Sequence, residues 1–145
     1  MKGTRRKSRE LLMQMLYQTE VGKQPPEDVA EHFWTSREGE VEPESRAFAE
    51  ELFRAATERS AEVDALIEKH AQNWRLERMQ AVDRNLLRGA VAELLAWPKT
   101  PHAVVINETL EVARRYAAQD SAKFLNGVLD AVARELLEKR LNEKQ

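Results

Sequence analysis

Residues 79–97, with the sequence MQAVDRNLLRGAVAELLAW, indicate most clearly which fold class this chain adopts. Apolar side chains recur there every three or four residues over about five turns, which is the pattern of an amphipathic α-helix. Pro98 and Pro101 follow, and proline ends a helix because it lacks the backbone N–H. The apolar stripe consists of Met79, Val82, Leu86, Ala90, Val91, Leu94 and Leu95.

The same periodicity continues on both sides of this helix, and no segment alternates apolar and polar residues as a strand would. Ala, Leu, Glu, Arg and Lys dominate the composition, and these residues favour helices. We therefore expect an all-α fold, either one domain or two helical subdomains that share a core. About seven helices are predicted, over residues 4–20, 27–34, 44–59, 60–70, 79–97, 102–117 and 120–140.

The composition excludes several classes of protein. Hydrophobic residues make up 42% of the chain and charged residues 33%, which suits a packed core beneath a heavily solvated surface. Cysteine is absent, which excludes disulfides, thiolate metal sites and catalytic thiols and fits a reducing compartment. No run approaches the roughly 20 apolar residues that would cross a membrane, and no signal peptide is recognisable. We expect a cytoplasmic protein.

Positive charge is concentrated at the N-terminus. The first nine residues contain five cations and no acid, although the net charge of the whole chain is −2. The predicted helix over residues 4–20 places Arg5, Arg6 and Arg9 on one ridge. Such a ridge indicates an anionic partner, and a solubilising tail is the alternative. The five cations are Lys2, Arg5, Arg6, Lys7 and Arg9.

Nothing in the sequence indicates catalysis. The three histidines lie in separate segments without the spacing of metal ligands. No serine lies in a Gly-x-Ser-x-Gly turn, and no glycine-rich loop follows a strand to hold a phosphate. The acidic pairs have the pattern of a solvated surface. We therefore predict a binding protein without a cofactor or a metal, and not an enzyme.

Three polar or small residues within predicted helices and one aromatic residue in a connector are expected to have structural roles. Gly127 is expected to let another helix approach closely, because glycine in a helix otherwise costs about 1 kcal/mol relative to alanine. Asn107 and Asn126 are expected to form hydrogen bonds in the core or at helix ends, and ligand contact is the alternative. Trp74 is expected to fill a gap between helices.

Four blocks then follow one another in an order and spacing similar to that of the NusB family. Leu125 stands where the family usually has Val, a difference that affects packing only. The block at 121–130 is the most specific of the four. The blocks are RRKSR at 5–9 with MLYQ at 15–18, DRNLLR at 83–88 with EL at 93–94, the run from 101 to 113, and SAKFLNGVLD at 121–130.

The resemblance implies a compact NusB-like bundle of two helical subdomains, residues 1–72 and 73–145. It implies transcription antitermination by binding of single-stranded boxA RNA from ribosomal RNA operon leaders. A NusE-type small-subunit ribosomal protein would bind jointly, within an antitermination complex on RNA polymerase. Asp83 matches a position tied to the side that faces that protein. The positions matched to RNA binding are Arg5, Arg6, Lys7, Arg9, Tyr17, Asp120, Lys123 and Phe124.

Alternatives stay open at this point. Tyr17 or Phe124 would offer a ring to a base, but Phe124 also falls on the apolar stripe of its helix and would then be core. A protein-only adaptor or homodimerisation module, whose basic ridge binds an acidic protein, is the second function. The same helical domain also resembles the N-terminal part of certain rRNA cytosine methyltransferases. Because the chain ends at Gln145, a standalone factor is expected.

Overall fold

The computed structural model describes residues 2–72 and 74–144, with side chains from Arg5 onward. Within these residues the chain forms seven α-helices, two short 3₁₀ turns and no strand, which confirms the predicted all-α fold. The 3₁₀ turns are Thr35–Arg37 and Leu76–Arg78. The helices are α1 Lys2–Glu20, α2 Pro26–His32, α3 Pro43–Glu58, α4 Ser60–His70, α5 Ala81–Ala96, α6 His102–Tyr116 and α7 Ser121–Glu143.

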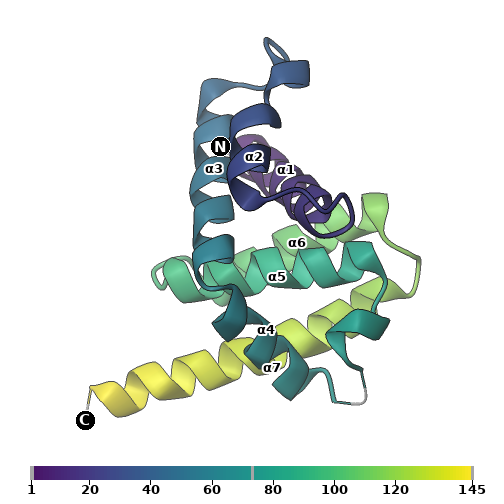
Figure 1. The fold of residues 1–145 in the computed structure, drawn as a ribbon. Coiled ribbons are helices and arrows are strands. Elements are labelled where there is room, and N and C mark those ends of the chain that lie inside the picture. Colours follow the sequence, from purple (N-terminus) through teal and green to yellow (C-terminus); the bar gives the residue numbers. More distant parts are fainter. Residues whose placement is uncertain (1, 73, 145) are drawn as a thin grey trace.

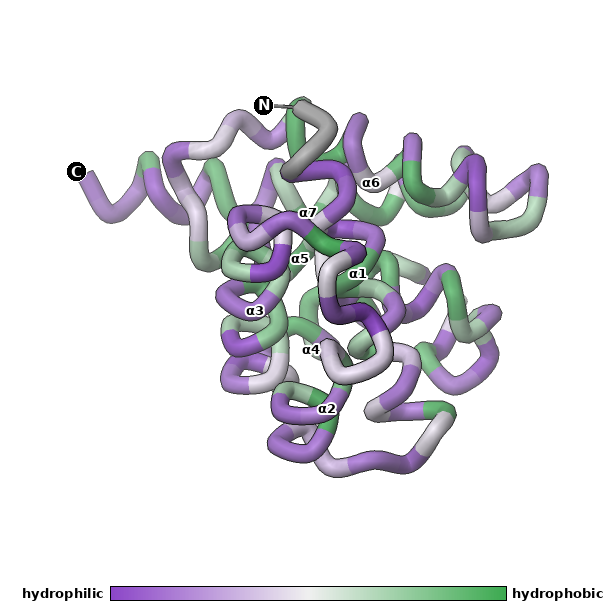
Figure 2. Tube along the Cα trace, turned by 90° about the horizontal axis from the view of Figure 1, so that it is seen from above, coloured by the Kyte–Doolittle hydropathy of each residue, from purple (hydrophilic) through white to green (hydrophobic). Residues whose placement is uncertain are grey.

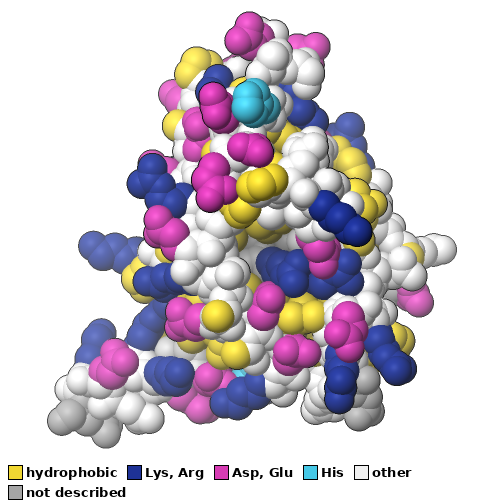
Figure 3. Space-filling view, in the orientation of Figure 1, with side chains coloured by type: hydrophobic (Ala, Val, Ile, Leu, Met, Phe, Trp, Pro, Cys, Tyr) yellow, Lys and Arg dark blue, Asp and Glu magenta, His cyan; other side chains and the backbone are white. Residues whose placement is uncertain are grey.

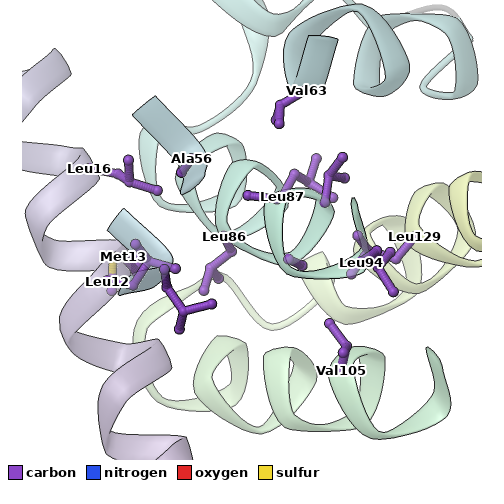
Figure 4. Packing of buried hydrophobic residues seen from close by; sticks show 14 of the residues in the cluster. Leu12, Met13, Leu16, Ala56, Val63, Leu86, Leu87, Leu94, Val105 and Leu129 are labelled. Carbon is purple, nitrogen blue, oxygen red and sulfur yellow. The ribbon is translucent and has the colours of Figure 1, made fainter. Parts of the chain in front are cut away.

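Helix α5 lies at the centre of the bundle, and α1, α3, α4, α6 and α7 all pack against it (Figure 1). Burial on α5 extends beyond the predicted apolar stripe, since Leu87, Gly89 and Ala92 are buried as well, and α5 therefore has neighbours on several sides. Each helix alternates hydrophobic and hydrophilic stretches along its trace (Figure 2). The core is one continuous cluster with members from α1 through α7 (Figure 4).

Close helix packing depends on Gly89 and not on Gly127. A Cβ at Gly89 would lie 2.8 Å from Cδ2 of Leu12, so a side chain there would push α1 away from α5. A Cβ at Gly127 would meet nothing within 4 Å. The interpretation of Gly127 as a packing glycine is therefore wrong.

Three other structural interpretations are also wrong. Trp74 does not fill a gap between helices, since 52% of its surface is exposed. Asn107 and Asn126 are both exposed on the outside of α6 and α7 instead of bonding in the core. The reason is that apolar periodicity alone does not specify which side of a helix another helix covers.

The predicted division into subdomains, 1–72 and 73–145, stays a prediction. Buried residues from both halves belong to the same core cluster, and Asn73 lies outside the described residues. None of the helices that the structure describes is both long enough and apolar enough to cross a bilayer.

Candidate functional site

Three exposed cations, Arg5, Arg6 and Lys7, form a cluster at the start of α1, here called the α1 cation cluster. The Arg5 guanidinium lies 3.7 Å from the centre of the Phe48 ring on α3. Arg6 donates from Nε and Nη2 to the two carboxylate oxygens of Glu108 on α6, at 3.1 and 2.9 Å. These hydrogen bonds raise the pKa of the Arg6 guanidinium. Lys7 Nζ lies 3.4 Å from Glu10 Oε1, so Arg6 and Lys7 each have a carboxylate partner within the chain.

Arg9 differs from the α1 cation cluster because it is buried between α1 and α5. It donates from Nε and Nη2 to Glu93, at 2.8 and 2.5 Å, and its Nη1 lies 3.9 Å from Glu108. Only 2% of Glu93 is exposed, and a buried carboxylate needs a partner of opposite charge. The predicted ridge of Arg5, Arg6 and Arg9 is therefore corrected: Arg9 turns inward and anchors α1 to α5.

An open groove of about 470 Å³ adjoins the α1 cation cluster. Phe48 and Trp97 are in its lining, with their ring centres 5.7 Å apart in an edge-to-face arrangement. Arg5 and Glu108 also line the groove. Phe48 is buried beneath Arg5, so the groove offers cations for phosphates and the partly buried Trp97 as its ring for a base.

Exposed residues continue from this cluster along α1 and α6. The two helices run in the same direction, because Arg6 meets Glu108 in the middle of α6 and Glu10, later on α1, meets Tyr116 at the end of α6. Burial and the hydrogen bond to Glu10 raise the pKa of the Tyr116 hydroxyl. Arg115 is exposed and lies 3.5 Å from Glu10. The sequence did not single out Arg115, because nothing local distinguishes it from other surface arginines.

A second cluster, here called the α7 aromatic cluster, consists of Lys123, Phe124 and Trp74. The rings of Phe124 and Trp74 meet edge to face with centres 6.3 Å apart. Phe124 is half-buried, so its ring packs against the core on one side and is partly open to solvent on the other. Lys123 is exposed and has no ion pair among the described residues, and Asp120 is exposed just before α7. Trp74 was missed as a site residue; its position in a polar connector was the available signal.

Asp83 is buried where the start of α5 meets the start of α7. Its Oδ2 accepts a hydrogen bond from the Ser121 hydroxyl at 3.1 Å, and its Oδ1 has no partner within the described part of the chain. Burial raises the pKa of the Asp83 carboxyl, the charge of Asp120 adds to this, and the bond from Ser121 opposes it. Asp83 therefore holds α7 in place and does not present its carboxylate on the surface.

The predicted site residues thus form two groups instead of one pocket. Arg5 and the exposed Tyr17 are twelve positions apart on α1, about 18 Å at about 1.5 Å per residue. Arg9 meets the end of α5 and Glu20 meets Arg84 near its start, so α1 and α5 are antiparallel. The start of α7, bonded to Asp83, therefore lies toward the Tyr17 end. No three His, Asp or Glu side chains among the described residues could hold a metal. Two groups of residues this far apart are better placed to contact an extended polymer than a small molecule.

Comparison with known proteins gives one consistent result. The model of the NusB family matches residues 6–134. The transcription antitermination protein NusB of Koribacter versatilis (strain Ellin345) is 60% identical over 134 residues, which cover 92% of this chain and 91% of that protein. NusB of T. maritima has a solved structure that matches with a TM-score of 0.81 and 33% identity, covering 90% of this chain and 91% of that one.

A solved complex of the antitermination factors NusB and NusE with double-stranded RNA also matches. Its TM-score is 0.82 at 26% identity, and the match covers 93% of this chain and 99% of the other. These relatives are transcription antitermination proteins, which confirms the prediction of a binding protein and not an enzyme. By its family model, its relatives and its fold, this chain belongs to the NusB family.

Proposed function

We propose that this chain is a cytoplasmic antitermination factor that binds single-stranded boxA RNA of ribosomal RNA operon leaders together with a NusE-type ribosomal protein. The complex would act on RNA polymerase during transcription. The observation that carries the proposal is the pair of exposed clusters, one cationic and one aromatic, at the two ends of an extended surface.

The α1 cation cluster supplies the phosphate contacts in this proposal. The fork of Arg6 already binds a carboxylate through two donors, which is also how arginine binds a phosphate. Arg5 and Lys7 add two exposed charges beside it. Each phosphate contact to a single strand contributes about 0.7 to the slope of log affinity against log salt.

The α7 aromatic cluster supplies the base contacts. Bases of a single strand are free to stack on side chains, and each stacked base contributes about 1–3 kcal/mol. Trp74 and Phe124 offer two ring faces, and Lys123 is beside them for a phosphate. Tyr17, exposed on α1, would extend this surface toward the α1 cation cluster.

Arg9 and Asp83 act indirectly in this proposal. Arg9 anchors the helix that carries the α1 cation cluster, through its ion pair with Glu93. Asp83 holds the start of the helix that carries Lys123 and Phe124, next to the exposed Asp120. Asp83 would affect the binding of a NusE-type partner indirectly, through the position of α7.

The test is a fluorescence anisotropy titration of labelled RNA with the protein, with and without a NusE-type partner, at two salt concentrations. A boxA-like strand, a scrambled strand and a duplex of the boxA-like sequence are compared. Tighter binding of the boxA-like strand, strengthened by the partner, supports the proposal. Equal, weak binding of all three RNAs, unaffected by the partner, would favour a protein-only adaptor.

A further inference from the structure

The outer face of α7 carries a regular seam that the bundle does not cover. The seam consists of Gly127, Asp130, Arg134, Leu137 and Leu141, at alternating spacings of three and four residues. Leucine is among the residues most often buried in folded proteins, yet 50% of the surface of Leu137 and 55% of that of Leu141 is exposed. Spacings of three and four are those of the contact positions of a two-helix coiled coil. The last turns of α7 extend beyond the helices that pack on its first part (Figure 1).

A groove of about 330 Å³ runs beside this seam, between α6 and α7. Asp130, Arg134 and Leu137 line it from α7, and the amides of Asn107 and Asn126 line it as well. Neither amide has a hydrogen-bond partner among the described residues. Gly127 leaves open space next to the groove. Exposed leucines beside an open glycine and unpaired amides are the surface that a second helix would cover.

We propose that this seam pairs antiparallel with the α7 seam of a second copy of this chain. A two-fold axis that is perpendicular to α7 and crosses the seam at the level of position 132 places Asp130 opposite the partner's Arg134, and Arg134 opposite the partner's Asp130. The same register places Gly127 opposite the partner's Leu137, where the missing side chain leaves room for the leucine. Lys123 then lies opposite the partner's Leu141, and its aliphatic stem covers that leucine.

The charge pattern favours a second copy over another protein. Antiparallel coiled coils pair unlike seam positions, and here each of these pairs joins a residue to one that complements it in charge or size. Asp130 and Arg134 already pair within the helix at 2.7 Å, and an exposed pair of this kind contributes little. Exchanging it for two pairs across the axis therefore costs little. This proposal does not depend on RNA binding.

The test is sedimentation equilibrium of the full chain over about a hundredfold range of concentration, since mass action reveals a dimer. The mass should rise from 16.7 kDa toward twice that value. Asp130→Arg and Arg134→Asp should each weaken dimerisation by about tenfold or more, because each places like charges across the axis. An equimolar mixture of the two variants should recover the dimer, since every seam pair between unlike variants is then of opposite charge.

The mixture separates pairing between chains from effects within one helix, because no single chain regains its internal pair. Leu137→Lys should also abolish the dimer, and circular dichroism would check that each variant is folded. A single species of monomer mass at every concentration would overturn the proposal. A wild-type dimer that the single variants leave intact would place the interface elsewhere. Loss of NusE-type partner binding by these variants, with no wild-type dimer, would assign the seam to that partner.

Discussion

The α1 cation cluster and the α7 aromatic cluster differ in how the chain satisfies their charges. In the first, Arg6 and Lys7 have carboxylate partners within the chain, Glu108 and Glu10. In the second, Lys123 has no ion pair among the described residues. Across the face shown in Figure 3, basic side chains lie beside acidic ones over most of the surface.

The comparison shows that a concentration of cations in the sequence does not measure the charge available to an RNA. In the proposed complex, a phosphate at the start of α1 would have to replace the Glu108 carboxylate that is already bound to Arg6. At the start of α7, an RNA strand bound as proposed would meet two rings and a lysine that has no ion pair among the described residues. The first cluster should contribute most to salt dependence, and the second should contribute most to affinity.

The largest effect is expected where the α1 cation cluster is anchored. Arg9→Met leaves the Glu93 carboxylate buried without its partner, and breaking a buried pair in this way costs about 3–5 kcal/mol. Urea denaturation followed by circular dichroism would measure the lost free energy of unfolding.

Two further variants test that explanation. Arg9→Met combined with Glu93→Met should recover most of the loss, because both charges are removed together. Arg5→Met should cost less than about 1 kcal/mol, because it removes only an exposed contact with Phe48. Equal losses for Arg5→Met and Arg9→Met would show that Arg9 is not the anchor.

The next largest effect is expected in the α7 aromatic cluster. Trp74→Ala should weaken binding of the boxA-like strand by about 1–3 kcal/mol, the contribution of one stacked base. The melting temperature should change little, because half of the side chain is already exposed. The anisotropy titration and a thermal melt would provide the two measurements.

Phe124→Leu is the matched variant for Trp74→Ala. If the ring of Phe124 stacks on a base, this variant should keep the melting temperature and bind RNA more weakly. Loss of folding together with loss of binding would show instead that Phe124 acts as core.

Asp83→Asn tests how the start of α7 is held. Because the pKa of Asp83 is raised, the folded state binds this proton more tightly than the unfolded chain does. The stabilising contribution is complete below the unfolded-state pKa of about 3.9 and is lost as the pH rises through the folded-state pKa. At pH 7 the asparagine variant should therefore be more stable, by on the order of 1 kcal/mol.

Urea denaturation of Asp83→Asn and the wild type from pH 3 to pH 8 would check this prediction. The difference between the two proteins should vanish below about pH 4, where Asp83 is protonated in both states. A variant that is less stable than the wild type at pH 7 would contradict the assignment of a destabilising buried charge.

The smallest effect is expected from removing the carboxylate that competes for Arg6. Glu108→Gln should tighten RNA binding by about 0.2–1 kcal/mol, the contribution of an exposed ion pair. The salt slope should steepen by up to about 0.7, because Arg6 becomes free to bind a phosphate.

Glu111→Gln is the control for Glu108→Gln, because Glu111 lies on the same helix and pairs with the exposed Arg114. It should change affinity and salt slope much less than Glu108→Gln does, because Glu111 acts on Arg6 only through its charge and not through a hydrogen bond. Weaker RNA binding by Glu108→Gln would mean that Glu108 holds Arg6 in the orientation that RNA needs.

The helices were predictable because they depend on local periodicity. The apolar stripe of residues 79–97 marks α5, Ala81–Ala96, and the proline residues after it mark its end. The cations at the start of α1 were also visible, since they are adjacent in the sequence. Gly127 and Asn126 were misread because periodicity does not show which face of α7 the bundle leaves open.

The sequence by itself determined an all-helical chain, the order of its helices and the two segments in which RNA-binding residues are proposed. Only the tertiary structure decided which of those residues face solvent. Arg9 is buried because Glu93, 84 positions away, lies against it, and Arg6 is paired because Glu108 is 102 positions away and adjacent in space. The physical reason is that helix periodicity is local, whereas burial and charge pairing depend on neighbours that only the packed bundle brings together.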